Sequence, residues 1–137
     1  MRDDPDAPPV LVALPPVTVT GVAEVRRRVT EAAAEVGLSP ERVASFTVAV
    51  NEIVINAVEH GGGTAVVTLI LEPERLVVEV VDHGTAPWQF SVPAAAPPPD
   101  QPHGRGLWLA TKLSDELTVD ARGADRLVRL TANAGGR

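Results

Sequence analysis

Cysteine is absent from this sequence, which excludes disulfide bonds and thiolate metal sites. Lysine is nearly absent: Lys112 is the single one, and 12 basic against 18 acidic side chains give a formal net charge of −6. This balance argues against direct nucleic-acid binding, which needs a basic surface to displace counterions. No apolar run approaches the roughly 18 residues of a membrane span, and no basic-then-apolar leader is visible. We therefore expect a soluble, cytoplasmic protein with neither a nucleic-acid nor a membrane partner.

What the sequence does contain is typical of one globular domain. Its 137 residues are 45% hydrophobic and 22% charged. A chain of this length and composition can form a hydrophobic core that needs no disulfide or metal to stabilise it. We predict a single domain over residues 10–132, with short tails at 1–9 and 133–137.

Two helices are predicted in the first half of this domain. Apolar residues recur every three or four positions between Gly21 and Val36, which indicates an amphipathic helix that stops at Gly37. A second helix is predicted from Ser39, a suitable N-cap, to about His60. Apolar side chains lie on most sides of this second helix, so we expect it to be buried at the centre of the domain.

The remaining segments predict strands, a short helix and a long loop. The strand candidates, rich in β-branched residues, are 10–14, 64–71, 75–82, 116–119 and 126–131. A short helix is expected at 107–113. The segment 83–103 holds six of the 13 prolines, which favours an irregular loop acting as a lid. This order predicts an α+β fold, a two-layer α/β sandwich whose mixed, mainly antiparallel sheet carries the helices on one face.

The buried second helix contains two conspicuous polar residues, Glu52 and Asn56. They are one turn apart and therefore share a face of the helix. Leaving a carboxylate and a carboxamide unpaired in an apolar setting is costly. Either they pair with each other or with a backbone group, or they face a ligand, and the sequence leaves both readings open. As oxygen donors they suit a hard cation such as Mg²⁺.

Asp82 ends a strand of apolar residues and is followed by His83 and Gly84. A carboxylate at the exit of a buried strand is well placed to accept a hydrogen bond from an exocyclic amine, and Gly84 lets the backbone approach a planar ligand. The alternative is an ordinary Asp-x-Gly turn.

Gly104-Arg105-Gly106-Leu107 opens the last predicted helix. Two glycines at a helix start expose backbone N–H groups at the positive end of the helix dipole, which suits phosphate, and Arg105 is the basic side chain beside them. Neither a P-loop nor a dinucleotide-binding glycine motif occurs anywhere in the sequence.

Taken in order, these three segments resemble the GHKL (Bergerat-type) ATP-binding domain shared by gyrase, heat-shock chaperone ATPases, MutL-type repair proteins and sensor histidine kinases. Residues 51–61 (NEIVINAVEHG) are similar to its first box, 82–84 to its second and 104–107 to its third. The resemblance covers about residues 10–132. It is closest to the bacterial anti-sigma-factor serine/threonine kinases, which are single domains of this length.

The resemblance implies the histidine-kinase-like ATPase fold, with ATP and Mg²⁺ as ligands. Asn56 would coordinate the Mg²⁺, and Glu52 would be the catalytic carboxylate that orients or deprotonates the attacking hydroxyl. Asp82 would accept from the adenine amine, with Gly84 shaping the pocket. The phosphates would be held by Gly104, Arg105, Gly106 and Leu107.

It also implies a function: a protein kinase that sequesters a sigma factor, regulates transcription and phosphorylates an antagonist protein, with a homodimer as the expected assembly. One alternative is a nucleotide-gated binding module without useful catalysis. Another is a detached catalytic domain of a sensor histidine kinase, which the lack of a phospho-accepting helix pair disfavours.

The sequence departs from the family pattern at two places. Ala86 replaces the second glycine of the second box, and Gly123-Ala124-Asp125 stands where the family often has Gly-Thr. These departures lower the expected kinase activity more than the expected ATP binding.

Overall fold

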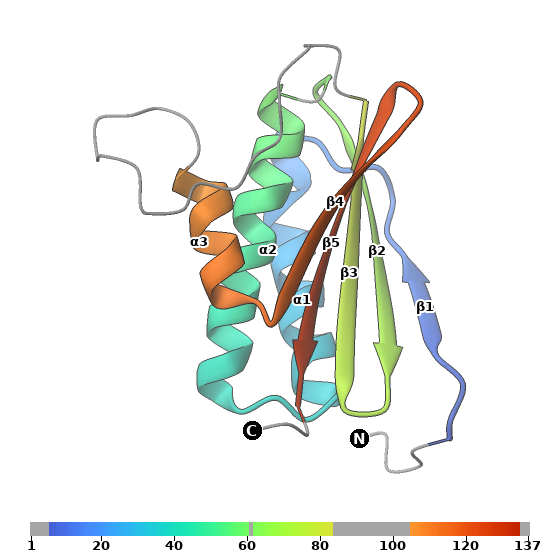
Figure 1. Ribbon diagram of the computed structural model, residues 1–137, viewed down its shortest axis with the longest axis vertical. Helices are drawn as coiled ribbons and strands as arrows, with labels where there is room; N and C mark the ends of the chain where they lie inside the picture. The colour runs from blue at the N-terminus through green and yellow to red at the C-terminus, as the bar shows by residue number, and fades with distance from the viewer. Residues whose placement is uncertain (1–5, 61, 84–104, 135–137) are drawn as a thin grey trace.

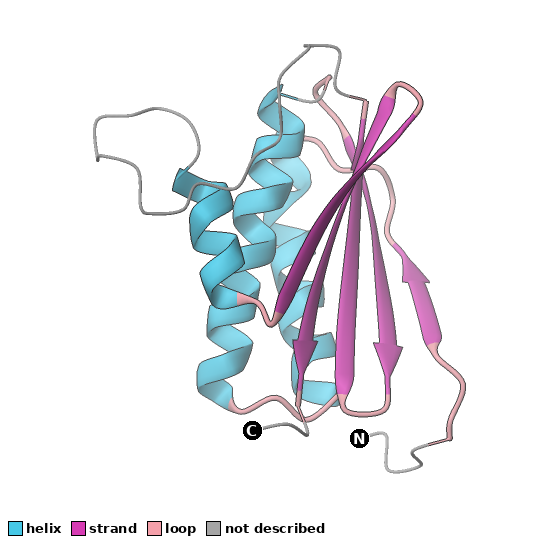
Figure 2. Ribbon diagram, in the orientation of Figure 1, coloured by secondary structure: helices cyan, strands magenta, loops and turns pink. Residues whose placement is uncertain are grey.

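Helices and an antiparallel sheet form two layers in the computed structural model, which describes residues 6–60, 62–83 and 105–134 (Figures 1 and 2). The elements are β1 (Val10–Ala13), a 3₁₀ helix (Val19–Gly21), α1 (Val22–Glu35), α2 (Pro40–His60), β2 (Ala65–Glu72), β3 (Arg75–Asp82), α3 (Arg105–Leu113), β4 (Glu116–Arg122) and β5 (Asp125–Asn133). The strand order is β1-β2-β3-β5-β4, and every described pairing is antiparallel. The predicted α+β sandwich is therefore confirmed, with the helices on one face of the sheet.

The two long helices follow the local rules that predicted them. α1 buries Val25, Val29 and Ala33 on the stripe that the apolar spacing indicated. Gly37, with φ of 101°, makes the turn to α2. The Ser39 hydroxyl accepts the backbone N–H of Arg42 at 3.3 Å, which caps the start of α2.

The hydrophobic core fills the space between the two layers. α2 contributes Phe46 and Val54, which are at most 1% exposed, and β3 contributes Leu76, Val78 and Val80, each fully buried. Alternate residues of a strand point to the same side, so the side chain of residue 82 also points toward the helices. The core thus determines that the side chain at the end of β3 faces the helices.

Within the described ranges, no helix is long and apolar enough to cross a membrane.

The last two strands are longer than the sequence predicted. β4 continues to Arg122 and β5 begins at Asp125 and runs to Asn133, against the predicted ranges 116–119 and 126–131. Gly123, with φ of 64°, closes a tight turn in which Arg122 still pairs with Asp125. The added residues are alanine or polar and include no large apolar residue, so hydrophobicity gave no signal there. Backbone pairing continues regardless of side-chain type.

Candidate functional site

The first and third of the predicted segments come into contact where α3 packs against α2. A Cβ added to Gly106 would lie 2.7 Å from Oε1 of Glu52 and 3.5 Å from Nδ2 of Asn56. Glu52 and Asn56 thus face the first turn of α3, and residue 106 has no room for a side chain unless Glu52 moves. The sequence placed these residues some 50 positions apart, and the packing of α2 on α3 brings them together.

Glu52 and Asn56 are half-buried, and neither forms a hydrogen bond or an ion pair with any residue that the structure describes. Their neighbour Asn51 differs, because its Oδ1 accepts a hydrogen bond from Arg26 Nη1 at 3.4 Å. The structure therefore does not show the pairing within the protein that the sequence left open. Both side chains can therefore accept hydrogen bonds from water or from a ligand.

The start of α3 supplies backbone donors beside these two side chains. Leu107 is 5% exposed and belongs to the core, so it anchors the first turn of the helix. The first N–H groups of a helix have no acceptor within it and point along the positive end of its dipole. The helix begins at Arg105, whose side chain lies outside the described part, as does all of Gly104.

Asp82, the residue predicted to bind the adenine amine, is buried and forms an ion pair within the protein. It is 2% exposed, and Arg126 donates to both of its oxygens, from Nη2 to Oδ1 at 2.8 Å and from Nε to Oδ2 at 3.2 Å. The two residues are directly opposite in the β3–β5 ladder. Sequence reasoning missed Arg126, because only this register reveals that it faces Asp82.

A hydrogen bond between two more side chains lies next to this ion pair at the same strand ends. His83 Nδ1 is 2.6 Å from Asp125 Oδ1, and the two side chains are 59% and 40% exposed. Gly84 and the rest of the predicted lid, residues 84–103, lie outside the described residues.

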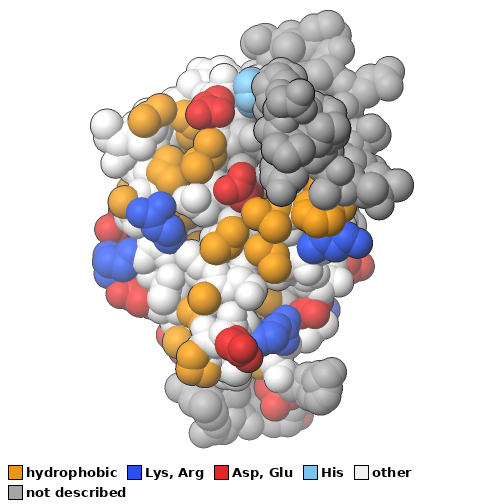
Figure 3. All heavy atoms as spheres, turned by 90° about the vertical axis from the view of Figure 1, so that its left-hand side faces the viewer, with side chains coloured by type: hydrophobic (Ala, Val, Ile, Leu, Met, Phe, Trp, Pro, Cys, Tyr) orange, Lys and Arg blue, Asp and Glu red, His pale blue; other side chains and the backbone are white. Residues whose placement is uncertain are grey.

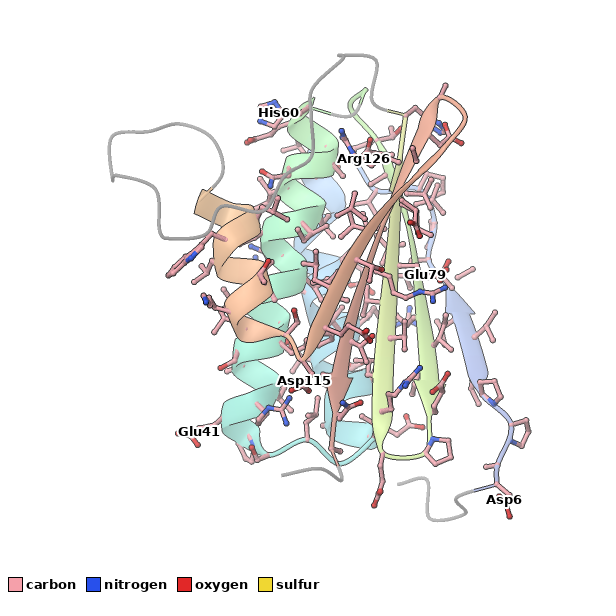
Figure 4. The ribbon with its side chains drawn as sticks, in the orientation of Figure 1. Asp6, Glu41, His60, Glu79, Asp115 and Arg126 are labelled. Carbon is pink, nitrogen blue, oxygen red and sulfur yellow. The ribbon has the colours of Figure 1, made fainter. Side chains whose placement is uncertain are left out.

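All of these residues gather toward one end of the molecule. The C-terminal part of α2, the end of β3 and the start of α3 lie there in Figure 1, and Figure 4 shows Arg126 on the sheet at the end where α2 finishes at His60. A half-buried carboxylate and carboxamide face a helix N-terminus, with a buried acid nearby on the sheet. This combination suits an anionic ligand that also carries a hydrogen-bond donor.

The chemistry of these side chains also suits Mg²⁺, which keeps several waters and takes one or two protein oxygens plus phosphate oxygens. The Asn56 amide and the Glu52 carboxylate supply such oxygens without any competing partner among the described residues. No group of three His, Cys, Asp or Glu that could cage a metal occurs in the described ranges.

A separate hollow lies between α1 and α2. Its volume is about 650 Å³, and it is lined by Arg26, Thr30, Ala34, Leu38, Pro40, Val43, Ala44 and Thr47. None of the predicted site residues lines it.

On the helical side of the molecule, hydrophobic side chains lie among scattered acidic and basic ones (Figure 3).

Comparison with known proteins agrees with this fold. The model of the family described as histidine kinase-like ATPase domain matches residues 16–132. The chain is also similar to the crystal structure of the RsbU and RsbW domains of Rv1364c from Mycobacterium tuberculosis, with 26% sequence identity and a TM-score of 0.64. That likeness covers 93% of this chain but 32% of the other, so this chain spans about a third of its length. A search of curated proteins gave no match.

Proposed function

The chain belongs to the histidine kinase-like ATPase domain family, and on that basis we propose that it binds Mg-ATP at the C-terminal half of α2, beside the start of α3 and the end of β3. We further propose that it transfers the γ-phosphoryl group to a serine or threonine of a partner protein. The observation that carries the proposal is that a Cβ added to Gly106 would lie within 3.5 Å of side-chain atoms of both Glu52 and Asn56. This packing brings a helix N-terminus suited to phosphates against two oxygen-bearing side chains that have no partner among the described residues.

The phosphates would lie at the start of α3, where the backbone N–H groups of Gly106 and Leu107 donate to them. The Asn56 amide oxygen would hold Mg²⁺ together with phosphate oxygens, and the cation neutralises phosphate charge when it is bound. Asp82 would accept a hydrogen bond from the adenine 6-amino group. Gly84, Gly104 and Arg105 complete the proposed site from the sequence resemblance alone.

Glu52 would act on the hydroxyl that attacks the γ-phosphorus. As the new oxygen–phosphorus bond forms, the bond between the γ-phosphorus and the β,γ-bridging oxygen breaks, and ADP leaves with that electron pair. The hydroxyl proton passes to the Glu52 carboxylate. Such a transfer depends mainly on positioning and charge stabilisation, which these residues would supply.

We propose that the partners are a sigma factor, which the ATP-bound protein sequesters, and an antagonist protein, which it phosphorylates. The resemblance to anti-sigma-factor kinases and the likeness to a chain containing an RsbW domain support this assignment. A homodimer is part of the same proposal.

Mg-ATP should bind more tightly than Mg-GTP. Guanine presents a carbonyl where adenine presents its 6-amino group, so two acceptors would face each other at Asp82. The cost is about 1–3 kcal/mol, or roughly fivefold to 140-fold in affinity. Isothermal titration calorimetry with both nucleotides measures the ratio. A Glu79→Gln variant should keep the wild-type ratio of the two affinities. Glu79 lies on β3 three residues before Asp82 and faces the opposite side of the sheet. Equal affinities for ATP and GTP would remove Asp82 from the base site.

A further inference from the structure

The pair formed by Asp82 and Arg126 differs from the other carboxylate–arginine pair on the same two strands. Glu79 and Arg129 are also directly opposite in the β3–β5 ladder. They lie on the open face of the sheet, and the Arg129 side chain is 48% exposed. The side chains of Asp82 and Arg126 face the helices, with 3% and 13% exposed. The strands therefore carry two pairs of the same chemistry, one on the surface and one buried at the candidate site.

Burial makes a purely stabilising role for the inner pair a weak explanation. Removing two charges from water costs about as much as their attraction returns, so an apolar pair of similar volume would hold the strands together equally well. What an apolar pair would not provide is a carboxylate held in a fixed orientation. Arg126 binds both oxygens side-on through Nε and Nη2, which stops the carboxylate from rotating about its last bond.

The clamp leaves acceptor capacity on Asp82. Each carboxylate oxygen has about two lone-pair sites, and Arg126 occupies one on each oxygen. One site per oxygen remains, in the carboxylate plane that the guanidinium defines. A single exocyclic amine of a ligand could therefore bind Asp82 without displacing Arg126.

We propose that Arg126 is a specificity-determining positioning residue of the nucleotide site: by clamping Asp82, it fixes the acceptor that reads the adenine 6-amino group. This inference rests on the proposed function, since it assumes that the base lies at Asp82. Arg126 acts through Asp82 and does not itself need to touch the base. Without the clamp, Asp82 turns to other partners and no longer distinguishes bases by their 6-substituent.

The test compares Mg-ATP with the Mg complex of purine riboside 5′-triphosphate, which has the same phosphates but hydrogen in place of the 6-amino group. Dissociation constants are measured for the wild type, Arg126→Met, Arg126→Lys and the control Arg129→Met, with a thermal melt of each. Wild type should prefer ATP by about tenfold to a hundredfold, the range for a hydrogen bond to a charged group. Arg126→Met should reduce the preference to within about twofold, whereas Arg129→Met should keep it.

Arg126→Lys keeps the positive charge and so protects folding if Arg126→Met is unstable. The lysine ammonium cannot form two parallel hydrogen bonds to the two Asp82 oxygens as the guanidinium does. The ratio of the two affinities, ATP over purine riboside triphosphate, should therefore still fall to less than about a third of the wild-type value. A merely structural role would weaken both triphosphates equally and leave the ratio unchanged. An unchanged ratio in the arginine variants, or no preference in wild type, overturns the role of Arg126. Failure of the wild type to bind Mg-ATP at all overturns the proposed function itself.

Discussion

Replacing Glu52 with glutamine should leave Mg-ATP binding within about twofold of wild type while slowing phosphoryl transfer by about 10²–10⁴-fold, the usual effect of losing a general base. Glutamine has nearly the same shape, and Glu52 has no partner among the described residues whose loss would disturb α2. Binding is measured by calorimetry. Transfer is measured with γ-labelled ATP and the small protein that co-purifies with the chain from its native cell.

The matched control for Glu52→Gln is Glu41→Gln, on the same helix at its other end, where Glu41 points away from the molecule (Figure 4). It should leave both measurements unchanged. A Glu52→Gln protein that transfers phosphate at the wild-type rate would contradict the catalytic role alone. A wild type that binds Mg-ATP but labels nothing would favour the nucleotide-gated binding module. Acid-labile label would indicate phosphohistidine rather than a serine or threonine ester.

Replacing Asn56 with alanine should weaken Mg-ATP binding by at least about tenfold, the scale of losing a group that supports a bound metal. The affinity for ATP without Mg²⁺ should change much less, because the phosphate donors at the start of α3 remain. Asn56 is half-buried and has no partner among the described residues, so the free energy of unfolding should change by only about 0.5 kcal/mol. Calorimetric titrations with and without Mg²⁺ give both affinities.

Asn51→Ala is the matched control for Asn56→Ala. It removes the same side chain from the same helix, but Asn51 faces α1, where it accepts a hydrogen bond from Arg26. The control should keep the wild-type affinity for Mg-ATP. If both asparagine variants bind Mg-ATP normally, or if both lose stability by the same amount with affinity unchanged, the polar face of α2 is structural.

The fold was predictable from local signals wherever these coincide with core packing. Ser39 and Pro40 mark the start of α2, and the apolar spacing of α1 gives its bounds to within a residue. The ends of β4 and β5 were not predictable in this way. Arg122 and Asp125 extend the ladder through backbone hydrogen bonds, which side-chain hydrophobicity does not report.

The candidate site was predictable as a set of residues but not as a geometry. The order and spacing of the three segments pointed to Glu52, Asn56 and Gly106, whereas their contact depends on how α3 packs on α2. Arg126 gave no signal of its own, since it is 44 residues from Asp82 and resembles any surface arginine of a strand. Its role requires the register of β3 with β5.

An amide NMR titration of the uniformly labelled protein with Mg-ATP measures most directly where the nucleotide binds. The largest shift changes should fall on Glu52 and Asn56 of α2, on Asp82, and on Gly106 and Leu107 at the start of α3. They should be much smaller for Asn56→Ala at a Mg-ATP concentration that half-saturates the wild type. Changes confined to the hollow between α1 and α2, around Thr30 and Thr47, would contradict the assignment. So would the absence of any change at saturating Mg-ATP.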